Sequence, residues 1–381
     1  MRRIVGIALL LSGVLNAPST ASAAPCVQQG LRAGGAHGLV AVRHGQTLTA
    51  CDGRPITGLR LVTVPGLHGT LHSNETRVDG LVGAPQLRDG HYGAGGHADL
   101  AKLDRRLETQ QARYGWVRLV IALILGVLAL VAPRRAITGA AGAIAGALVL
   151  SAFGSSSIVL LAVLTVAGAL LPWRALWLFF AAYLVVLVVS PETQSLALLG
   201  PHPWGGGRFY GLTNELETLV LAPAVVLGLP AAPLVLLTVG WSRAGSDGGG
   251  LLTFLGAYVW LTGRPRVAAL AALALAVLFV LVDAATGGSN HVTHSLLHGG
   301  LPHDVWHRWS VSWHGATANV WRVVMCVVSL AALVWVATRR PRDRRVDAFL
   351  LAILVSLVAN DTPQDVLLWG AITGVGLRRA V

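Results

Sequence analysis

Arg208, Asn214, Glu215 and Glu217 gather within a short stretch, residues 204–217, that leads into an apolar run. Ionisable groups at the edge of hydrocarbon are costly, so they usually have a partner or a task. An arginine can hold a carboxylate or a phosphate through two parallel hydrogen bonds, and a nearby glutamate can exchange protons with a ligand. Two interpretations follow: Arg208 pairs with Glu215 or Glu217 and fixes a loop, or Arg208 binds an anionic substrate and Glu215 acts as a general acid or base.

Two helix starts coincide with this kind of polar sequence. Asn214 and Glu215 suit the amino terminus of a helix, where capping and the helix dipole favour them. Near the carboxyl terminus, the segment 359–365 ends one apolar run and begins another, and Asp361 or Thr362 can cap the final helix ahead of Pro363. The alternative is that Asn360 and Asp361 belong to a substrate-binding site.

A third polar segment, residues 240–250, places Arg243 and Asp247 among five glycines between two apolar runs that are too short to span a membrane. Irregular backbone at membrane depth is tolerated where it is buried in protein or lines a cavity, and exposed amides there can cradle an anion. The segment therefore predicts a substrate-binding role for Arg243 and an acid or base role for Asp247. A plain outer loop between two short helices is the alternative.

Histidines are concentrated after Asp283, and three of them would share one face of a helix, namely His291, His294 and His298. Clustered histidines with aspartates can bind zinc, but these spacings match no specific metalloprotein pattern, and solvated histidines at the membrane interface are the alternative. We therefore predict no metal ligand. His291 beside Asp283 is the candidate for acid or base chemistry.

The elements that must position these residues belong to a membrane protein. Of the 381 residues, 54% are hydrophobic and only 12% are charged, and the mean hydropathy is +0.65, which is outside the range of soluble globular chains. The first residues are two arginines, an apolar run and a small-residue cleavage site, which is the pattern of a secretory signal peptide over residues 1–24. The chain that follows is expected to begin outside the cytoplasm.

Residues 25–115 are predicted to form a small extracytoplasmic α+β domain. Apolar residues alternate over 39–43 and 59–64, as in strands, whereas 98–113 has helical spacing and leads towards the first membrane segment. Cys26 and Cys51 both lie in this exported part, where a disulfide between them is expected. Cys326 stands alone in an apolar run and is expected to be a small buried hydrophobic residue.

Residues 116–381 are predicted to form an all-α polytopic domain of about eleven transmembrane helices, some of them short and broken. The runs are 116–133, 136–153, 157–171, 174–190, 212–229, 230–241, 250–262, 267–284, 320–338, 346–360 and 365–377. With an outer start, this order places the arginine-rich connections in the cytoplasm, as the positive-inside rule expects. The net charge of +12 thus reports topology and not nucleic-acid binding. We expect a bacterial cytoplasmic membrane protein with a cytoplasmic carboxyl terminus and an outward-facing polar site.

The motif from Gly207 to Glu215, Gly-Arg-Phe-Tyr-Gly-x-x-Asn-Glu, resembles that of a family of uncharacterised bacterial multi-pass membrane proteins. Members often carry an alkaline-phosphatase-like extracytoplasmic domain, which the short exported segment here cannot contain. The resemblance covers about 116–380. The residues that match the family's motifs are Arg208, Tyr210, Asn214, Glu215, Asp247, His291, Asn360 and Asp361. The last motif departs from the expected Asn-Asp-Ser-Gly, because here it has Thr362 and Pro363.

These observations predict a cell-envelope membrane protein that binds or processes an anionic or lipid-linked substrate. Arg208, Tyr210, Asn214, Arg243, Asn360 and Asp361 would bind the substrate, with Glu215, Asp247 and His291 as acid and base groups. One alternative is a proton-coupled transporter that uses the same polar groups. Another is a non-catalytic scaffold that recruits an envelope protein through residues 25–115. No cofactor is identified by the sequence, and the bilayer itself is an expected partner.

Overall fold

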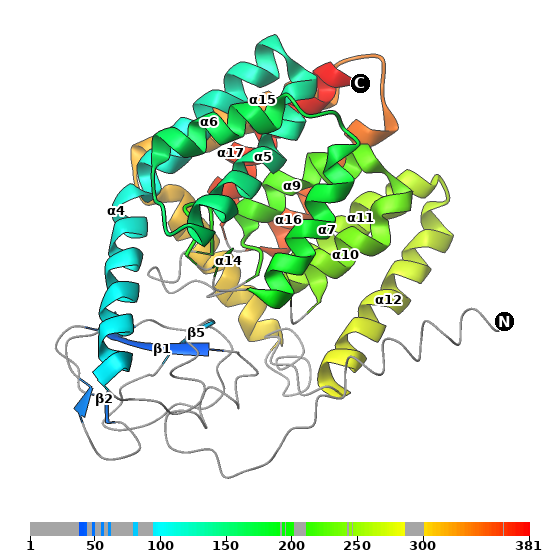
Figure 1. Cartoon of the computed structure of the whole chain (residues 1–381). Coiled ribbons are helices and arrows are strands. Elements are labelled where there is room, and N and C mark those ends of the chain that lie inside the picture. The colour runs from blue at the N-terminus through cyan, green and yellow to red at the C-terminus, as the bar shows by residue number, and fades with distance from the viewer. Residues whose placement is uncertain are drawn as a thin grey trace.

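A computed structural model gives the structure of residues 38–43, 48–49, 55–56, 60–61, 79–82, 94–190, 193–194, 196–201, 211–241, 244–245, 247–285, 301–360 and 362–381. This part of the chain is mostly helical (Figure 1). Its α-helices are α4 (Ala94–Val131), α5 (Pro133–Ala152), α6 (Ile158–Ala169), α7 (Ala175–Val189), α9 (Asn214–Leu227), α10 (Ala232–Gly240), α11 (Gly248–Thr262), α12 (Pro265–Ala285), α14 (Leu301–Thr317), α15 (Val320–Thr338), α16 (Arg344–Ala359) and α17 (Pro363–Ala380). A short 3-10 helix, η2 (Leu229–Ala231), precedes α10.

Three stretches of helix within the described residues are long and apolar enough to cross a membrane: Glu108–Val131, Pro133–Ala152 and Val320–Thr338. The first and third turn many apolar side chains outward, among them Val127 and Val328, which are 57% and 62% exposed. Such large exposed apolar surfaces are typical of contact with lipid. The chain is thus a helical protein with candidate membrane spans. Each predicted apolar run coincides with a helix, whereas eleven membrane crossings stay a prediction.

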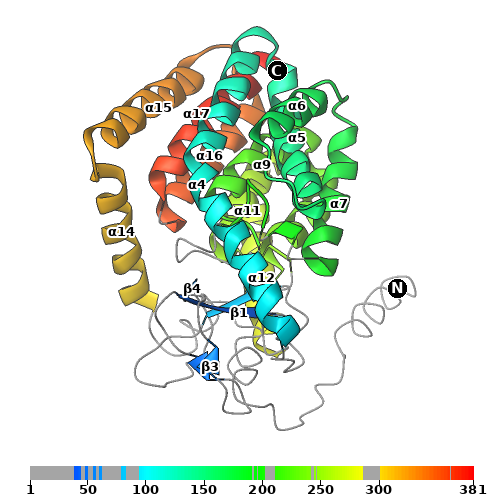
Figure 2. The same ribbon diagram turned by 60° about the vertical axis from the view of Figure 1, so that its left-hand side comes forward.

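Five short strands lie near the amino-terminal end of α4 (Figures 1 and 2). β1 (Gly38–Arg43) pairs antiparallel with β4 (Arg60–Leu61) and with β5 (Asp79–Val82), which gives the order β4-β1-β5. β2 (Leu48–Thr49) pairs with β3 (Pro55–Ile56). The strands predicted over 39–43 and 59–64 correspond to β1 and β4, while a folded α+β domain over 25–115 stays a prediction.

The helices pack closely where glycine removes the side chain. A Cβ atom on Gly142 of α5 would lie 2.7 Å from the Cα atom of Gly168 on α6, so the two backbones touch. In lipid, no hydrophobic driving force brings helices together. Small residues at a helix crossing stabilise the association instead, because they let the two backbones pack closely. α17 is the central helix, because it packs against α4, α5, α9, α15 and α16, and its Trp369 is fully buried.

The carboxyl terminus lies at the end of the helical bundle opposite the strands (Figures 1 and 2). Contacts at that end involve the arginine-rich connections: the Arg134 guanidinium lies 5.7 Å from the centre of the Trp173 ring, and Arg344 lies against Gly263. The helices therefore separate an arginine-rich end from the end at which α4 begins. Which of the two ends faces the cytoplasm stays a prediction.

Two cysteine predictions have different outcomes. Cys326 is half-buried on α15, so the expectation of a buried residue is wrong. It forms no disulfide with a described residue. The reason is that α15 turns most of its apolar side chains outward. Cys26 and Cys51 lie outside the described residues, as does the predicted signal peptide, and both predictions stay open.

Candidate functional site

Four carboxyl groups lie at the starts of three helices, as the pair Glu215 and Asp365 and the pair Glu217 and Asp247, here together termed the carboxyl cluster. Glu215, Glu217 and Asp247 are 3%, 0% and 1% exposed, which is unusual for acidic residues. α9, α16 and α17 pack against one another and α11 packs against α9 and α16, so the polar ends of these helices are neighbours. Because buried charge must be paired or hydrogen-bonded, the contacts within the cluster decide what it can do.

Helix starts explain why carboxyl groups collect here. Glu215 and Glu217 lie in the first turn of α9, Asp247 precedes α11, and Asp365 lies in the first turn of α17. The amino terminus of a helix carries partial positive charge and exposed amides, both of which stabilise a carboxylate. Three helix starts therefore offset part of the cost of burying the cluster.

Arg118 of α4 is the cation of the cluster within the described residues. Its Nε atom lies 3.6 Å from Glu215 Oε1, and its Nη2 atom pairs with Asp365 Oδ1. Its Nη1 atom donates to the Tyr114 hydroxyl at 2.7 Å. The guanidinium thus joins α4, α9 and α17 through two carboxylates, and Arg118 is the residue that holds this side of the cluster together.

The other side of the cluster contains Glu217 and Asp247. Asn360 Nδ2 donates to Glu217 Oε2 at 2.9 Å and to Ser356 Oγ at 2.8 Å. Asp247 acts on Glu217 electrostatically, and the Thr253 hydroxyl also contributes to the surroundings of Glu217. Glu217 and Asp247 are thus two buried carboxyl groups that interact with each other at the centre of this side of the cluster. The chemistry available to such a pair is the uptake and release of a proton.

Glycine makes room for Asn360 in this arrangement. A Cβ atom on Gly249 would lie 2.2 Å from Asn360 Oδ1, so a side chain at position 249 would displace the amide. The glycine-rich start of α11 is thus a packing requirement of the site. It allows the end of α16 to approach α11 closely enough for Asn360 to reach Glu217.

A backbone contact joins two of the polar segments selected from the sequence. The Leu212 amide donates to the Gly245 carbonyl oxygen at 2.9 Å, and Gln194 Nε2 donates to the Gly211 carbonyl oxygen at 2.6 Å. Gly211 has a φ of +88°, and a Cβ atom there would lie 2.1 Å from the Gly245 oxygen. The chain immediately after residue 210 is therefore fixed to the chain immediately after residue 243.

The structure brings together four of the residues selected from the sequence. Glu215, Asp247 and Asn360 belong to the cluster or touch it, and Asn214 Nδ2 donates to the Thr362 hydroxyl at 2.8 Å, which links α9 to α17. Arg208, Tyr210, Arg243, His291 and Asp361 lie outside the described residues. Their roles stay predictions.

The capping expectations need correction. α9 does begin at Asn214, but Thr213 caps it, because the Thr213 hydroxyl accepts from the Leu216 amide at 3.4 Å. α17 begins with Pro363 as expected, yet Thr362 makes no side-chain cap hydrogen bond, and its hydroxyl instead accepts from Asn214. Both threonines thus tie the start of a helix to the site.

Sequence reasoning missed Arg118, Tyr114 and Asp365. Arg118 is the one charged residue inside the predicted apolar run 116–133, so an ionisable group at membrane depth was the available signal. Glu217 was noted only as a partner for Arg208. In the part of the chain that the structure describes, no group of three or more His, Cys, Asp or Glu side chains is arranged to hold a metal ion.

No protein-family model, curated protein or solved structure matches this chain. The resemblance of the motif 207–215 to a family of membrane proteins therefore stays a prediction.

Proposed function

We propose that this chain is a multi-pass membrane protein of about eleven crossings with an outward-facing site for an anionic or lipid-linked substrate. Arg208 and Arg243 hold the anion, and the carboxyl pair Glu217 and Asp247 exchanges a proton with it. The predicted topology supports the outward direction, because all the polar segments fall on the side opposite the arginine-rich connections.

The observation that carries this proposal is the close approach of Gly211 to Gly245, which the hydrogen bond from the Leu212 amide to the Gly245 carbonyl oxygen fixes. Arg208 stands three residues before Gly211, and Arg243 stands two residues before Gly245. Consecutive Cα atoms are about 3.8 Å apart, so each arginine starts within about 11 Å of its glycine. Two arginines that are both close along the chain to one fixed contact can together hold a phosphate through charge-assisted hydrogen bonds.

The first prediction concerns anion binding. The purified chain, reconstituted in nanodiscs of neutral phospholipid, is expected to gain thermal stability from a polyprenyl phosphate and not from the matching neutral polyprenol. Arg208→Ala and Arg243→Ala should each weaken this effect about tenfold, since each removes charge-assisted hydrogen bonds to the phosphate. Titration of the unfolding temperature with added lipid measures the effect.

Arg135→Ala is the matched control, because Arg135 is an exposed arginine in the first turn of α5, at the other end of the bundle. Equal stabilisation by phosphate and alcohol, or an equal loss in Arg135→Ala, would contradict the proposal. Either result would favour the scaffold alternative, in which the polar motifs only hold short helices together.

A second function, proton-coupled transport of the same anion, is favoured by the burial of two interacting carboxyl groups, Glu217 and Asp247. Acidic groups in the interior of a membrane bundle commonly carry protons. Breaks between α10 and α11 and between α16 and α17 also meet at the cluster, as in transporters built from interrupted helices.

The second prediction separates transport from an enzyme that works on one face. In liposomes with a pH gradient, a transporter would accumulate the anion, and Glu217→Gln would abolish the dependence on the gradient while preserving anion binding. Uptake that is independent of the gradient in the unsubstituted protein would exclude proton coupling. Thr218→Ser, a conservative change at the next residue of α9, is the control for damage to the helix.

A further inference from the structure

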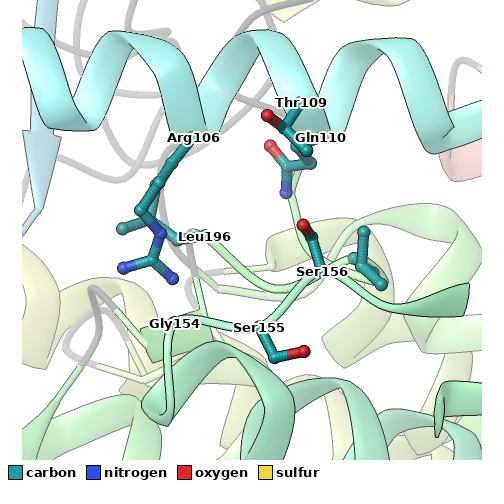
Figure 3. Close-up of a pocket in the computed structure, with 8 residues that line it drawn as sticks. Arg106, Thr109, Gln110, Gly154, Ser155, Ser156 and Leu196 are labelled. Atoms are coloured by element: carbon teal, nitrogen blue, oxygen red, sulfur yellow. The ribbon is translucent and has the colours of Figure 1, made fainter.

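A polar pocket of about 230 Å³ lies beside α4, outside the carboxyl cluster (Figure 3). It is here termed the Arg106 pocket, and its lining residues are Arg106, Thr109, Gln110, Gly154, Ser155, Ser156, Leu196 and Leu198. Gly154 has a φ of +67° and forms the turn between α5 and α6, with open space where its Cβ atom would be. The pocket thus combines one guanidinium with several hydroxyls, which are donors suited to an anion, whereas the Gln110 amide already donates to the Ala197 carbonyl oxygen.

Arg106 holds its position through the end of α5. One guanidinium nitrogen, Nη2, donates to the Ser151 carbonyl oxygen at 3.0 Å and to Ser151 Oγ at 3.2 Å. Figure 3 shows the side chain reaching from α4 towards Gly154. These bonds use one edge of the guanidinium, so a planar group with five donors retains capacity for a ligand.

Arg113 places a second positive charge beside the pocket, because it is bonded to the lining residue Ser156 without lining the cavity itself. Its Nη1 atom donates to Ser156 Oγ at 3.1 Å and to the Ser156 carbonyl oxygen. Among the described residues, no carboxylate forms an ion pair with Arg106 or Arg113. Burial lowers the pKa of Arg106 from its ordinary value, because the charged form loses hydration there. A negative group in the pocket would offset that lost hydration.

The pocket lies at the level where lipid headgroups are expected. Arg106 comes two residues before the candidate span Glu108–Val131, and Gly154 comes two residues after the candidate span Pro133–Ala152. Next to the pocket, Phe153 and Val159 are 84% and 73% exposed. A polar cavity at the ends of two spans, beside apolar side chains that face outward, has a place for both a headgroup and an acyl chain.

From these contacts we infer that the Arg106 pocket binds the phosphate group of an anionic phospholipid, with Arg106 as the cation in the pocket, Arg113 as a second positive charge beside it, and the acyl chains against Phe153 and Val159. This site goes beyond the proposed function and does not involve the carboxyl cluster. It would hold α4 and the α5–α6 turn at a fixed depth in the bilayer.

The third prediction tests this site with phosphatidylglycerol as the probe. The full chain is reconstituted in nanodiscs of phosphatidylcholine that contain a minor fraction of phosphatidylglycerol, then extracted, and the retained lipids are counted by native mass spectrometry. Selective retention of phosphatidylglycerol is expected, and Arg106→Gln should weaken it about tenfold through the loss of charge-assisted bonds. Arg135→Gln, an exposed arginine at the other end of the bundle, should retain the lipid fully.

Leu196→Trp is a second variant that fills the pocket and leaves both arginines in place, so it tests the site even if Arg106→Gln folds poorly. Loss of phosphatidylglycerol in both pocket variants supports the inference. Full retention in either folded pocket variant overturns it. Stabilisation by inorganic phosphate without retention of phosphatidylglycerol would also overturn it, because the ligand would then be a free anion. Neither pocket variant should change the response to polyprenyl phosphate, which separates this test from that of the proposed function.

Discussion

Arg118→Met is expected to destabilise the folded chain by about 3–5 kcal/mol, the usual cost of removing one partner from a buried ion pair. Arg118 is the cation that faces Glu215 and Asp365, and its side chain is only 19% exposed. Without it, two carboxylates at the starts of α9 and α17 would face each other with less hydration than they have in water. The change in the free energy of unfolding is measured by titration with a denaturing detergent, with tryptophan fluorescence as the signal of unfolding.

Removing the carboxylates along with the cation should restore most of the lost stability. In the triple variant Arg118→Met, Glu215→Gln and Asp365→Asn, no charge is left unpaired in this half of the cluster, and neutral replacements of buried ion pairs are often nearly neutral in stability. Arg135→Met is the control for loss of a positive charge. If Arg118→Met is no less stable than this control, Arg118 does not hold the cluster together.

The helices could be predicted because each is encoded locally. Apolar runs bounded by glycine, proline or arginine gave the predicted segments 230–241 and 250–262, and the structure has α10 and α11 there with the break between them. The same local signals predicted the start of α9 at Asn214. Burial of Glu215, Asp247 and Asn360 agrees with the expectation that polar residues inside a membrane domain face its interior.

The partners of these residues could not be predicted in the same way. Arg118 and Asp365 are separated by 247 positions, and nothing local to either residue indicates that α4 and α17 are neighbours. The sequence indicated Arg208 as the partner of Glu215, because the two are close along the chain. It did not indicate Arg118, which is close to Glu215 in space. The Arg106 pocket was missed for the same reason, since its lining comes from α4, the α5–α6 turn and residues 196–198.

Gly211→Ala is expected to cost about 3 kcal/mol or more and to weaken binding of the polyprenyl phosphate beyond what lower stability explains. A φ of +88° strains any residue with a Cβ atom by about 1–3 kcal/mol. The new methyl group would also lie 2.1 Å from the Gly245 carbonyl oxygen, which must move and lose its bond to the Leu212 amide. Because this contact fixes the chain next to Arg208 beside the chain next to Arg243, the proposed clamp should open.

Gly154→Ala separates the two causes, since Gly154 has a similar φ of +67° but open space around the position of its Cβ atom. It should show the backbone strain alone, with unchanged affinity for the polyprenyl phosphate. Equal losses of stability in the two variants would mean that the Gly211–Gly245 contact adds nothing. Normal affinity in a folded Gly211→Ala variant would mean that the two arginine-bearing segments need not be held together, and the clamp would then have to be assigned to other residues.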